Sequence, residues 1–441
     1  GKEKVTEDSE GKEEEKESVE ETQLNKEKPL WSMPNKEITP EMYNSFYKTI
    51  SNDWDDPMAV KHSHLEGSIS FDVLLYAPKR PPFSMFDQKK KKTIKLYCSS
   101  IFITDDLDLP EWMQCVTGII SSKDLPINVS REFLQGSNIK RIIKKTLMKK
   151  TVEMIKEMDQ SKYLNYYREF SSMIKLAARD EDPSLGLDKL LLFTSNKREN
   201  VSLQNYEFKE GQNDIYIITG TSLQEVKNSP FVSLFSDYEV LFFIDTIDEY
   251  LLQKLRTFNN KNITKINQEG VELPHSDISE EMVESLKGLK EKILSVLSGN
   301  DSEKSKNTIS DDLLIEKVEF KNLKDRHMIV QTPKHGISPA MEKIMAAQVS
   351  LDKNNMFMFP KGKKILYVNV THPLTFKLNN LLNDDQKFRE LLTVCMRVAC
   401  LQCGYNLDDP VMFSEQVISL LTDDSVGENE NNDKVVEEKV L

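Results

Sequence analysis

The chain has 441 residues, a formal net charge of −13 and 38% hydrophobic residues. This length predicts two or three domains, each with a core of ordinary size. The charge is uneven, because residues 1–28 and residues 422–441 each carry −5 and leave −3 for the residues between them. The acidity therefore belongs to the two ends, which argues against a general nucleic-acid-binding protein.

Five cysteines are few and odd in number, which indicates a reducing compartment and buried thiols rather than a disulfide framework. No apolar run approaches the length that spans a membrane, so we expect no membrane association. The sequence begins with Gly1 rather than Met, so we expect it to be part of a longer chain.

The first elements follow an N-terminal segment, residues 1–28, whose Lys/Glu/Ser-rich composition predicts a disordered linker. A helix is expected from Thr39 and Pro40, since threonine is a good N-cap and proline suits the first helical position. Alternating apolar residues predict a strand over 69–76. A second strand is expected over 94–103, with an irregularity at Ser99 and Ser100.

The stretch Leu125–Gln135 combines good N-caps, Asn128 and Ser130, with Arg131 in the first turn of a short predicted helix. A cation in the first turn interacts unfavourably with the helix dipole, at a cost of about 0.3–1 kcal/mol. Arg131 is therefore either an ordinary ion-pair partner or an arginine presented to an anion. Apolar residues at helical spacing predict a long helix over 138–158, with a basic face that is either solvated or a ligand surface.

Further helices are predicted over 163–176 and 185–193. Residues 214–275 have the strand and helix pattern of a βαβ unit, with buried strands over 214–218 and 240–244. Such units often bind nucleotides, but the turn here lacks the glycines that cradle phosphate, which favours a scaffold.

Residues 276–310 form a polar helical joint that we take as a domain boundary. Strands are predicted over 313–320, 327–331 and 365–370, and a Met-rich helix over 340–348. Two apolar helices, 388–403 and 412–421, end the ordered part. Because two such helices cannot cover each other, a four-helix bundle completed by a second copy predicts a two-fold dimer.

No motif in the sequence makes a self-contained active site. There is no phosphate-binding loop, dinucleotide fingerprint or nucleophile elbow. Cys400 and Cys403 form a C-x-x-C late in an apolar helix, where two core thiols are favoured over a redox or zinc site. His62 and His64 alternate along an extended segment without the partners of a metal site, which favours surface or pairing roles.

Several stretches together resemble the middle and C-terminal domains of the heat-shock protein 90 chaperone family, in order and over roughly residues 25–421. They are Asn25-Lys-Glu-Lys-Pro-Leu-Trp31, Phe46-Tyr47, Asn52-Asp-Trp54, Val60-Lys-His62, Pro78-Lys-Arg-Pro-Pro-Phe83, Ile94-Lys-Leu-Tyr97, Leu125–Gln135, Asp214–Gly220, Ser229-Pro-Phe231, Ile247-Asp-Glu-Tyr250, Met341-Glu-Lys-Ile-Met345, His372-Pro373 and Gly404-Tyr405.

The resemblance implies a homodimeric, ATP-driven clamp that binds partly folded client proteins. ATP and Mg²⁺ would be held mainly by an N-terminal domain that these residues do not include, so the chain alone is expected to be inactive as an ATPase. Arg131 would reach the γ-phosphate, Gln135 would support it and Asn128 would hold the loop. An arginine delivered in trans to a transferring phosphoryl group is worth about 10³–10⁵ in rate, far more than the dipole cost.

The resemblance also implies an architecture. It is an α/β middle segment of two α/β/α layers joined by helices, followed by an α+β dimerisation domain with a four-helix bundle across the dimer. The expected boundaries are a linker over 1–28, a middle domain over 29–276, a C-terminal domain over 277–421 and an acidic tail over 422–441.

Two groups of contact residues follow from the resemblance and the helical pattern. Contacts with clients or with the N-terminal domain are expected from Trp31, Phe83, Met341 and Met345, although Trp31 and Phe83 suit ordinary core positions equally well. The dimer interface is expected to include Leu391, Leu392, Cys395, Val398 and Leu420. Co-chaperones are a further possible class of partner.

The sequence departs from the family pattern at several positions. Ser99 and Ser100 replace a usual pair of arginines, and Ile337 replaces a usual tryptophan. These departures motivate an alternative, a non-catalytic client- or partner-binding dimeric scaffold that has lost its ATPase coupling. The chain ends Glu438-Lys-Val-Leu441, without the cytosolic co-chaperone-binding end or the endoplasmic-reticulum retrieval signal, which favours a mitochondrial or plastid member.

Overall fold

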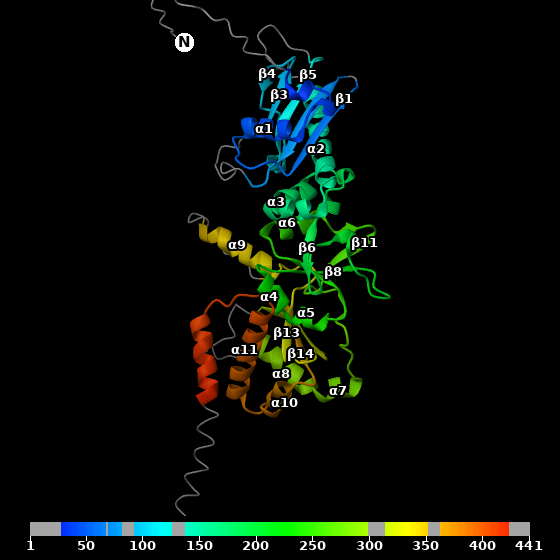
Figure 1. Cartoon of the computed structure of the whole chain (residues 1–441). Coiled ribbons are helices and arrows are strands. Elements are labelled where there is room, and N and C mark those ends of the chain that lie inside the picture. The colour runs from blue at the N-terminus through cyan, green and yellow to red at the C-terminus, as the bar shows by residue number, and fades with distance from the viewer. Residues whose placement is uncertain are drawn as a thin grey trace, which may run out of the picture. The chain divides into compact units, whose positions relative to one another are not determined.

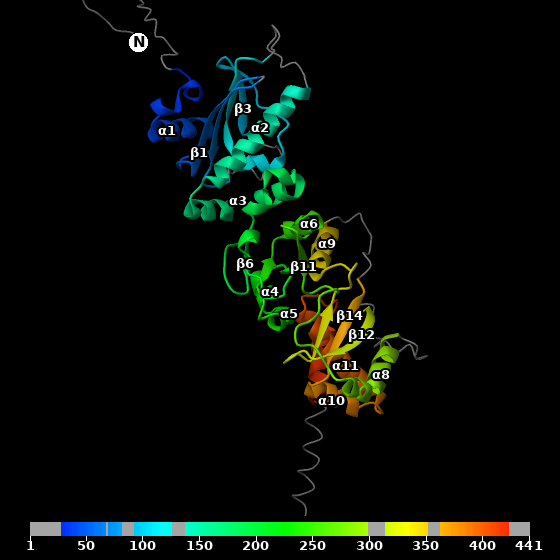
Figure 2. The same ribbon diagram turned by 90° about the vertical axis from the view of Figure 1, so that its right-hand side faces the viewer.

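The computed structural model describes residues 28–67, 69–81, 92–125, 137–298, 314–351 and 362–422. The chain divides into two compact units, Gly1–Glu169 (unit 1) and Phe170–Leu441 (unit 2). Most of their elements are labelled in Figure 1, and Figure 2 shows the same ribbon from a second direction.

Unit 1 is built on a five-stranded mixed sheet with the strand order β1-β2-β5-β3-β4. The central strand β5 runs parallel to β3 and antiparallel to β2. Its five residues from Gly118 to Ser122 are all buried, as expected for a strand covered on both faces. The strands are β1 (Ala59–Leu65), β2 (Phe71–Ala77), β3 (Ile94–Cys98), β4 (Ile101–Thr104) and β5 (Thr117–Ser122).

Helices cover both faces of this sheet (Figure 2). On one face α1 (Pro40–Ser51) packs with the short helix η1 (Leu30–Ser32) over Leu74 and Tyr76 of β2. On the other face α2 (Ser137–Lys156) contacts β1 and β2. The start of α1 is as predicted, with Pro40 first and the Thr39 hydroxyl accepting a hydrogen bond from the Met42 amide.

The remaining elements of unit 1 are short, apart from a long helix that contains the boundary between the units. They are η2 (Asn35–Glu37), η4 (Glu111–Cys115) and α3 (Gln160–Asp180).

Unit 2 begins with a six-stranded sheet of order β10-β11-β8-β9-β6-β7, in which β11, β8 and β9 are parallel. The crossover from β8 to β9 passes through two short helices, α4 and α5, which gives the predicted βαβ unit. These elements are β6 (Leu192–Ser195), β7 (Val201–Ser202), β8 (Ile215–Thr219), α4 (Leu223–Lys227), α5 (Pro230–Leu234), β9 (Val240–Phe243), α6 (Thr246–Lys254), β10 (Thr257–Phe258) and β11 (Lys261–Lys265).

Unit 2 continues with a three-stranded sheet of order β12-β14-β13 and the helices around it. Residues from both sheets of the unit belong to one hydrophobic core. The elements are α7 (Glu280–Ser285), α8 (Lys287–Ser298), β12 (Ile315–Lys321), β13 (Met328–Gln331), α9 (Pro339–Leu351), β14 (Lys364–Asn369), α10 (Pro373–Asn380), α11 (Asp385–Gln402) and a helix over residues 410–422.

The mixed α/β fold class is confirmed, and most predicted elements lie where the sequence pattern placed them. The four-helix bundle across a dimer and the domain boundary near residue 277 stay predictions. Among the described residues, no helix is long and apolar enough to cross a membrane.

Two local predictions were wrong. The predicted irregularity at Ser99 and Ser100 is confirmed, but residues 94–103 do not form one strand. Ser99 and Ser100 adopt positive φ angles of 45° and 68° and turn the chain into a β3–β4 hairpin. Residues 185–193 are not a helix. Gly186 at φ 65° ends one 3₁₀ turn, and a second 3₁₀ turn leads directly into β6.

Candidate functional site

The arginine loop is the first candidate site, and its predicted residues lie outside the described part of the chain. Arg131, Gln135 and Asn128 all fall in the segment 126–136, as does the predicted short helix. The structure does describe both elements that carry this segment. It leaves the carboxyl end of β5, the central strand of unit 1, and enters α2.

The chain leading into the arginine loop is held tightly. The Asp124 carboxylate accepts a hydrogen bond from the Ser70 amide at 2.8 Å, which ties the end of β5 to the start of β2. The Asp124 amide donates to the Ser122 hydroxyl at 3.1 Å, and Leu125 is buried. The loop therefore departs from a fixed point of the sheet.

The helix that follows the arginine loop is also fixed to the sheet. Ile143, Leu147 and Ile155 of α2 are buried. Near the end of α2, the Glu157 carboxylate pairs with Lys61 of β1 at 2.5 Å. The described residues on the two sides of the segment 126–136, in β5 and in α2, therefore both pack in unit 1.

Trp31 is buried and packs against Phe46 and Tyr97, with ring centroids 5.8 Å and 4.8 Å away. Its backbone carbonyl accepts a hydrogen bond from Nε2 of His62 at 3.0 Å, while Nδ1 of His62 accepts one from the Tyr43 hydroxyl at 2.8 Å. Trp31 therefore occupies a core position, which was the alternative to a contact with clients or with the N-terminal domain. Burial lowers the pKa of His62, which keeps this pairing histidine neutral. Phe83 lies outside the described residues.

Trp54 is the most exposed aromatic among the described residues of this unit, at 93% exposure. Ile101 and Phe102 of the edge strand β4 are also exposed, immediately after the Ser99–Ser100 turn. Sequence reasoning did not assign these three residues to a surface, although Trp54 stands in one of the quoted motifs. The sequence signal for their exposure is that they stand beside turn residues and not within a periodic apolar pattern.

Met341 and Met345 lie on α9, where both are half-buried. The start of α9 is fixed by Ser338, whose hydroxyl donates to the Glu249 carboxylate of α6 at 2.5 Å and accepts from the Met341 amide at 3.1 Å. Further along the helix, Lys343 pairs with Glu225 of α4 at 2.9 Å.

Glu249 is the buried centre of this anchor. Burial opposes its ionisation, but the ion pair with Lys265 at 2.7 Å and the hydrogen bond from Ser338 outweigh it and hold the pKa of Glu249 below its usual value. An ionised carboxylate therefore fixes α9, so its methionines sit on a firmly placed helix.

The residues predicted for the dimer interface divide into two groups. Leu391, Leu392 and Cys395 are buried in the chain's own core. Val398 and Leu420 are half-buried. The role of all five between two copies of the chain stays a prediction.

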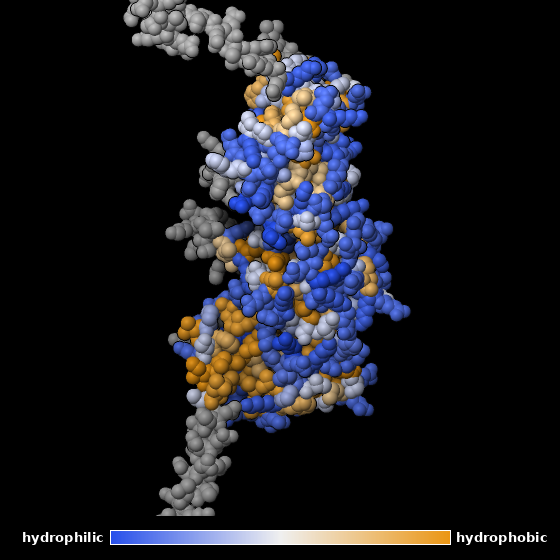
Figure 3. All heavy atoms as spheres, viewed as in Figure 1, coloured by the Kyte–Doolittle hydropathy of each residue, from blue (hydrophilic) through white to orange (hydrophobic). Residues whose placement is uncertain are grey.

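An apolar surface covers the end of α11 and the helix over 410–422, where Figure 3 shows hydrophobic atoms gathered. We call it the C-terminal apolar surface. Its exposed members are Leu401, Val411, Met412, Ile418 and Leu421. Sequence reasoning assigned none of these five residues to a surface, because both helices are apolar on more than one face.

Cys400 and Cys403 are buried, as predicted for core thiols. Burial raises the pKa of each to about 12, so both stay protonated and unreactive. Cys403 Sγ accepts a hydrogen bond from the Val330 amide at 3.3 Å. The described residues hold no group of three or more His, Cys, Asp or Glu side chains that could bind a metal ion.

Comparison with known proteins identifies the class. The family described as Hsp90 protein matches residues 1–440. The chain is 36% identical to heat shock protein 90 of Encephalitozoon cuniculi, over 92% of this chain and 59% of that protein. It is 34% identical to heat shock protein 83 of Leishmania donovani, over 89% of this chain and 88% of that sequence.

A third relative, the endoplasmin homolog of Dictyostelium discoideum, is 36% identical over 90% of this chain and 53% of its own length. The chain thus spans between half and two thirds of two of these three relatives. With a family match over nearly its whole length, this chain belongs to the Hsp90 family.

Proposed function

We propose that the chain acts as part of an ATP-dependent chaperone of the Hsp90 type, which binds partly folded client proteins as a dimeric clamp. The family match over residues 1–440 is the observation that carries this proposal. The arginine loop, the α9 surface and the C-terminal apolar surface each suit one part of the activity.

In the ATPase step, Arg131 reaches the γ-phosphate of ATP, Gln135 supports it and Asn128 holds the loop. The 441 residues contain no phosphate-binding loop. ATP and Mg²⁺ are therefore held by a nucleotide-binding domain outside these residues. ATP supplies the transferring phosphoryl group. The arginine offsets the negative charge on that group, which raises the rate of phosphoryl transfer by about 10³–10⁵-fold. The packing of β5 and α2 supports this role, because these two elements flank the segment that contains the three residues.

Client binding is assigned to α9. Met341, Ile344 and Met345 are half-exposed on a helix whose start is fixed by Ser338 and Glu249. Flexible, polarizable methionine side chains suit apolar partners of varied shape. Dimerisation is assigned to the C-terminal apolar surface, since exposed apolar clusters of this kind mark interaction sites.

Two measurements test the proposal on the 441-residue chain. Light scattering should give the mass of a dimer. The chain should suppress the aggregation of a chemically unfolded model enzyme, and a Met341→Ser/Met345→Ser variant should lose most of this effect. Met282→Ser, at a partly buried methionine of α7, is the matched control and should retain it. A monomeric chain, or equal suppression by both variants, would contradict the proposal.

The alternative is a dimeric scaffold without ATPase coupling, favoured by the departures at Ser99, Ser100 and Ile337. The structure places both serines at the exposed tip of the β3–β4 hairpin and leaves Ile337 half-buried just before α9. The upstream sequence discriminates between the two functions. A nucleotide-binding domain with an acidic catalytic residue supports the ATPase, and ATP turnover on joining that domain to this chain settles the choice.

A further inference from the structure

A cleft of 640 Å³ opens on unit 2 beside the α4–α5 turn. Its lining consists of three cationic residues, three serines, two asparagines and Val232, with no carboxylate. The volume lies within the range of about 300–1,000 Å³ that is typical of small-molecule sites. None of the functions proposed above uses this cleft.

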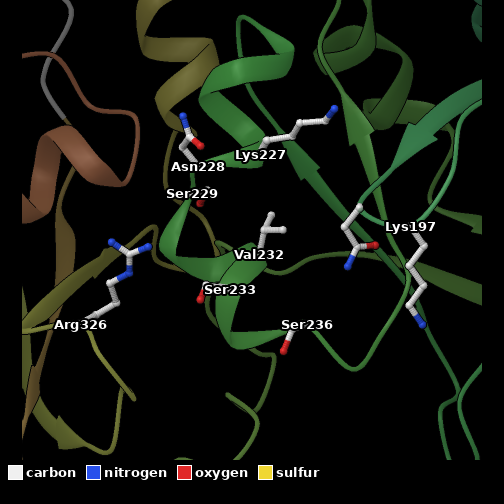
Figure 4. Close-up of a pocket in the computed structure, with 9 residues that line it drawn as sticks. Lys197, Lys227, Asn228, Ser229, Val232, Ser233, Ser236 and Arg326 are labelled. Carbon is white, nitrogen blue, oxygen red and sulfur yellow. The ribbon is translucent and has the colours of Figure 1, made fainter.

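The lining comes from segments far apart in the chain. Lys227 ends α4, Asn228 and Ser229 form the turn before α5, and Arg326 lies between β12 and β13. Figure 4 shows the guanidinium of Arg326 directed toward the turn that carries Asn228 and Ser229. Lys227 and Lys197 stand on the opposite side, with their ammonium groups turned outward.

The buried serine in this turn has an unused hydroxyl. Ser229 is only 6% exposed, and its side chain makes no capping hydrogen bond to α5. Its backbone amide donates to the Val226 carbonyl at 3.2 Å, which fixes the residue in the cleft wall. Because this hydroxyl does not cap α5, it can donate to a ligand that enters the cleft.

The cations of the cleft are available to a ligand. Within the described residues, neither Arg326 nor Lys227 makes an ion pair. Asp237, which follows the lining residue Ser236, is engaged elsewhere with Lys209 and His275, each at 3.3 Å. The chain as a whole carries −13, so this cluster is a local feature and does not reflect a basic protein.

We propose that this cleft binds a small phosphate-bearing anion, with Arg326 and Ser229 as the principal contacts and Lys227 as the second cation. The arginine offers paired N–H donors that match two phosphate oxygens, and the serine donates to a third. Lysine side chains are flexible enough to turn inward onto the remaining charge. α5 is too short to form an anion site by its own N-terminus, so binding depends on these side chains.

A bound anion would link the two parts of unit 2. Arg326 belongs to the three-stranded-sheet part and Ser229 to the six-stranded-sheet part, which share one core. A ligand held by both residues stabilises their present arrangement, because a molecule that binds only the folded state raises its stability by mass action.

The test is isothermal titration calorimetry of the 441-residue chain at constant ionic strength, with sodium chloride as the reference salt. Pyrophosphate represents free phosphate, O-phosphoserine represents an organic phosphate, and citrate is the carboxylate comparison. At least one phosphate compound should bind saturably, and more tightly than citrate. The tighter of the two phosphate compounds identifies whether the natural source is inorganic or organic.

Variants locate the binding. Arg326→Gln should weaken it about tenfold or more, and Ser229→Ala and Lys227→Gln by about threefold each. Arg256→Gln and Lys254→Gln remove the same charges from exposed positions in and beyond α6, outside this cleft, and should leave the affinity unchanged. Circular dichroism of each variant checks that its fold is intact.

Three results would overturn the proposal. They are no saturable binding of either phosphate compound, citrate binding as tight as that of the better phosphate, or equal affinities for Arg326→Gln and Arg256→Gln. None of these results depends on chaperone activity, so a failure of the anion-site proposal leaves the proposed chaperone function untouched.

Discussion

A Cβ atom on Gly118 would lie 2.3 Å from the carbonyl oxygen of Leu74, so β5 and β2 approach closely enough to exclude any side chain there. Gly118 is paired with Leu75 in the centre of the sheet of unit 1. The strand that carries the arginine loop therefore depends on a glycine for its place.

Gly118→Ala should lower the free energy of unfolding by about 1–3 kcal/mol, because backbone atoms cannot move aside for the new methyl group. Urea denaturation followed by circular dichroism measures this change. Gly67→Ala is the control, since its Cβ would meet only the Ile69 carbonyl at 3.7 Å, an ordinary contact. Equal stabilities for the two variants would show that β2 and β5 do not approach this closely.

The Ser99–Ser100 turn predicts a stabilising substitution. Both residues have positive φ angles, which two-residue hairpins favour but serine adopts at a cost. Replacing the pair by Asn-Gly should raise the free energy of unfolding by about 1 kcal/mol. Thermal unfolding measures the gain. Ser100→Val should be destabilising, and a stabilising effect of valine there would contradict the hairpin.

The strands and helices that were predicted correctly have sequence patterns that fit few other structures. The buried strands Val240–Phe243 and Ile215–Thr219 are continuous apolar runs, and α11 has a strong helical period. The failure at residues 185–193 has a local cause, because Gly186 in the left-handed region stops the helix that the apolar spacing suggested.

The candidate sites were harder to predict than the elements. An apolar helix shows that its residues are buried but not which partner covers them. Leu391 and Leu392 lie in the chain's own core, and their predicted role in a dimer interface stays a prediction. The cleft around Arg326 and Ser229 joins residues almost 100 positions apart, and no sequence period connects them. Only the tertiary contacts of unit 2 bring them together.

The ionised state of Glu249 predicts a pH dependence. Because the folded-state pKa is held below the usual value of 4.5, the unfolded chain takes up the proton first as the pH falls. The stabilisation from Glu249 is therefore present above pH 4.5 and is lost as the pH falls through the lower, folded-state pKa.

Glu249→Gln should accordingly show a shallower loss of stability below pH 4.5 than the unchanged chain. Urea denaturation at a series of pH values measures the slope. Glu210→Gln, at an exposed carboxylate, is the control and should follow the unchanged chain. If Glu249→Gln had the same slope as that control, the anchor at the start of α9 would not depend on an ionised carboxylate.

The C-terminal apolar surface should control the oligomeric state. Ile418→Asp and Leu421→Asp each place a charge on this exposed surface and should weaken the dimer by about 2 kcal/mol or more, roughly 30-fold in dissociation constant. Light scattering over a range of protein concentrations measures the shift. Phe376→Ser changes an exposed aromatic on α10 and should leave the dimer intact. A dimer that survives both aspartate variants would place the interface elsewhere.

The most direct measurement of the proposed function is ATP turnover by the chain joined to a nucleotide-binding domain of its family, with and without Arg131→Ala. The proposed role of Arg131 predicts a loss on the order of 10³-fold in turnover with nucleotide binding retained. Arg141→Ala, at an exposed arginine of α2, should be unaffected. Normal turnover by the Arg131→Ala protein would contradict the central claim.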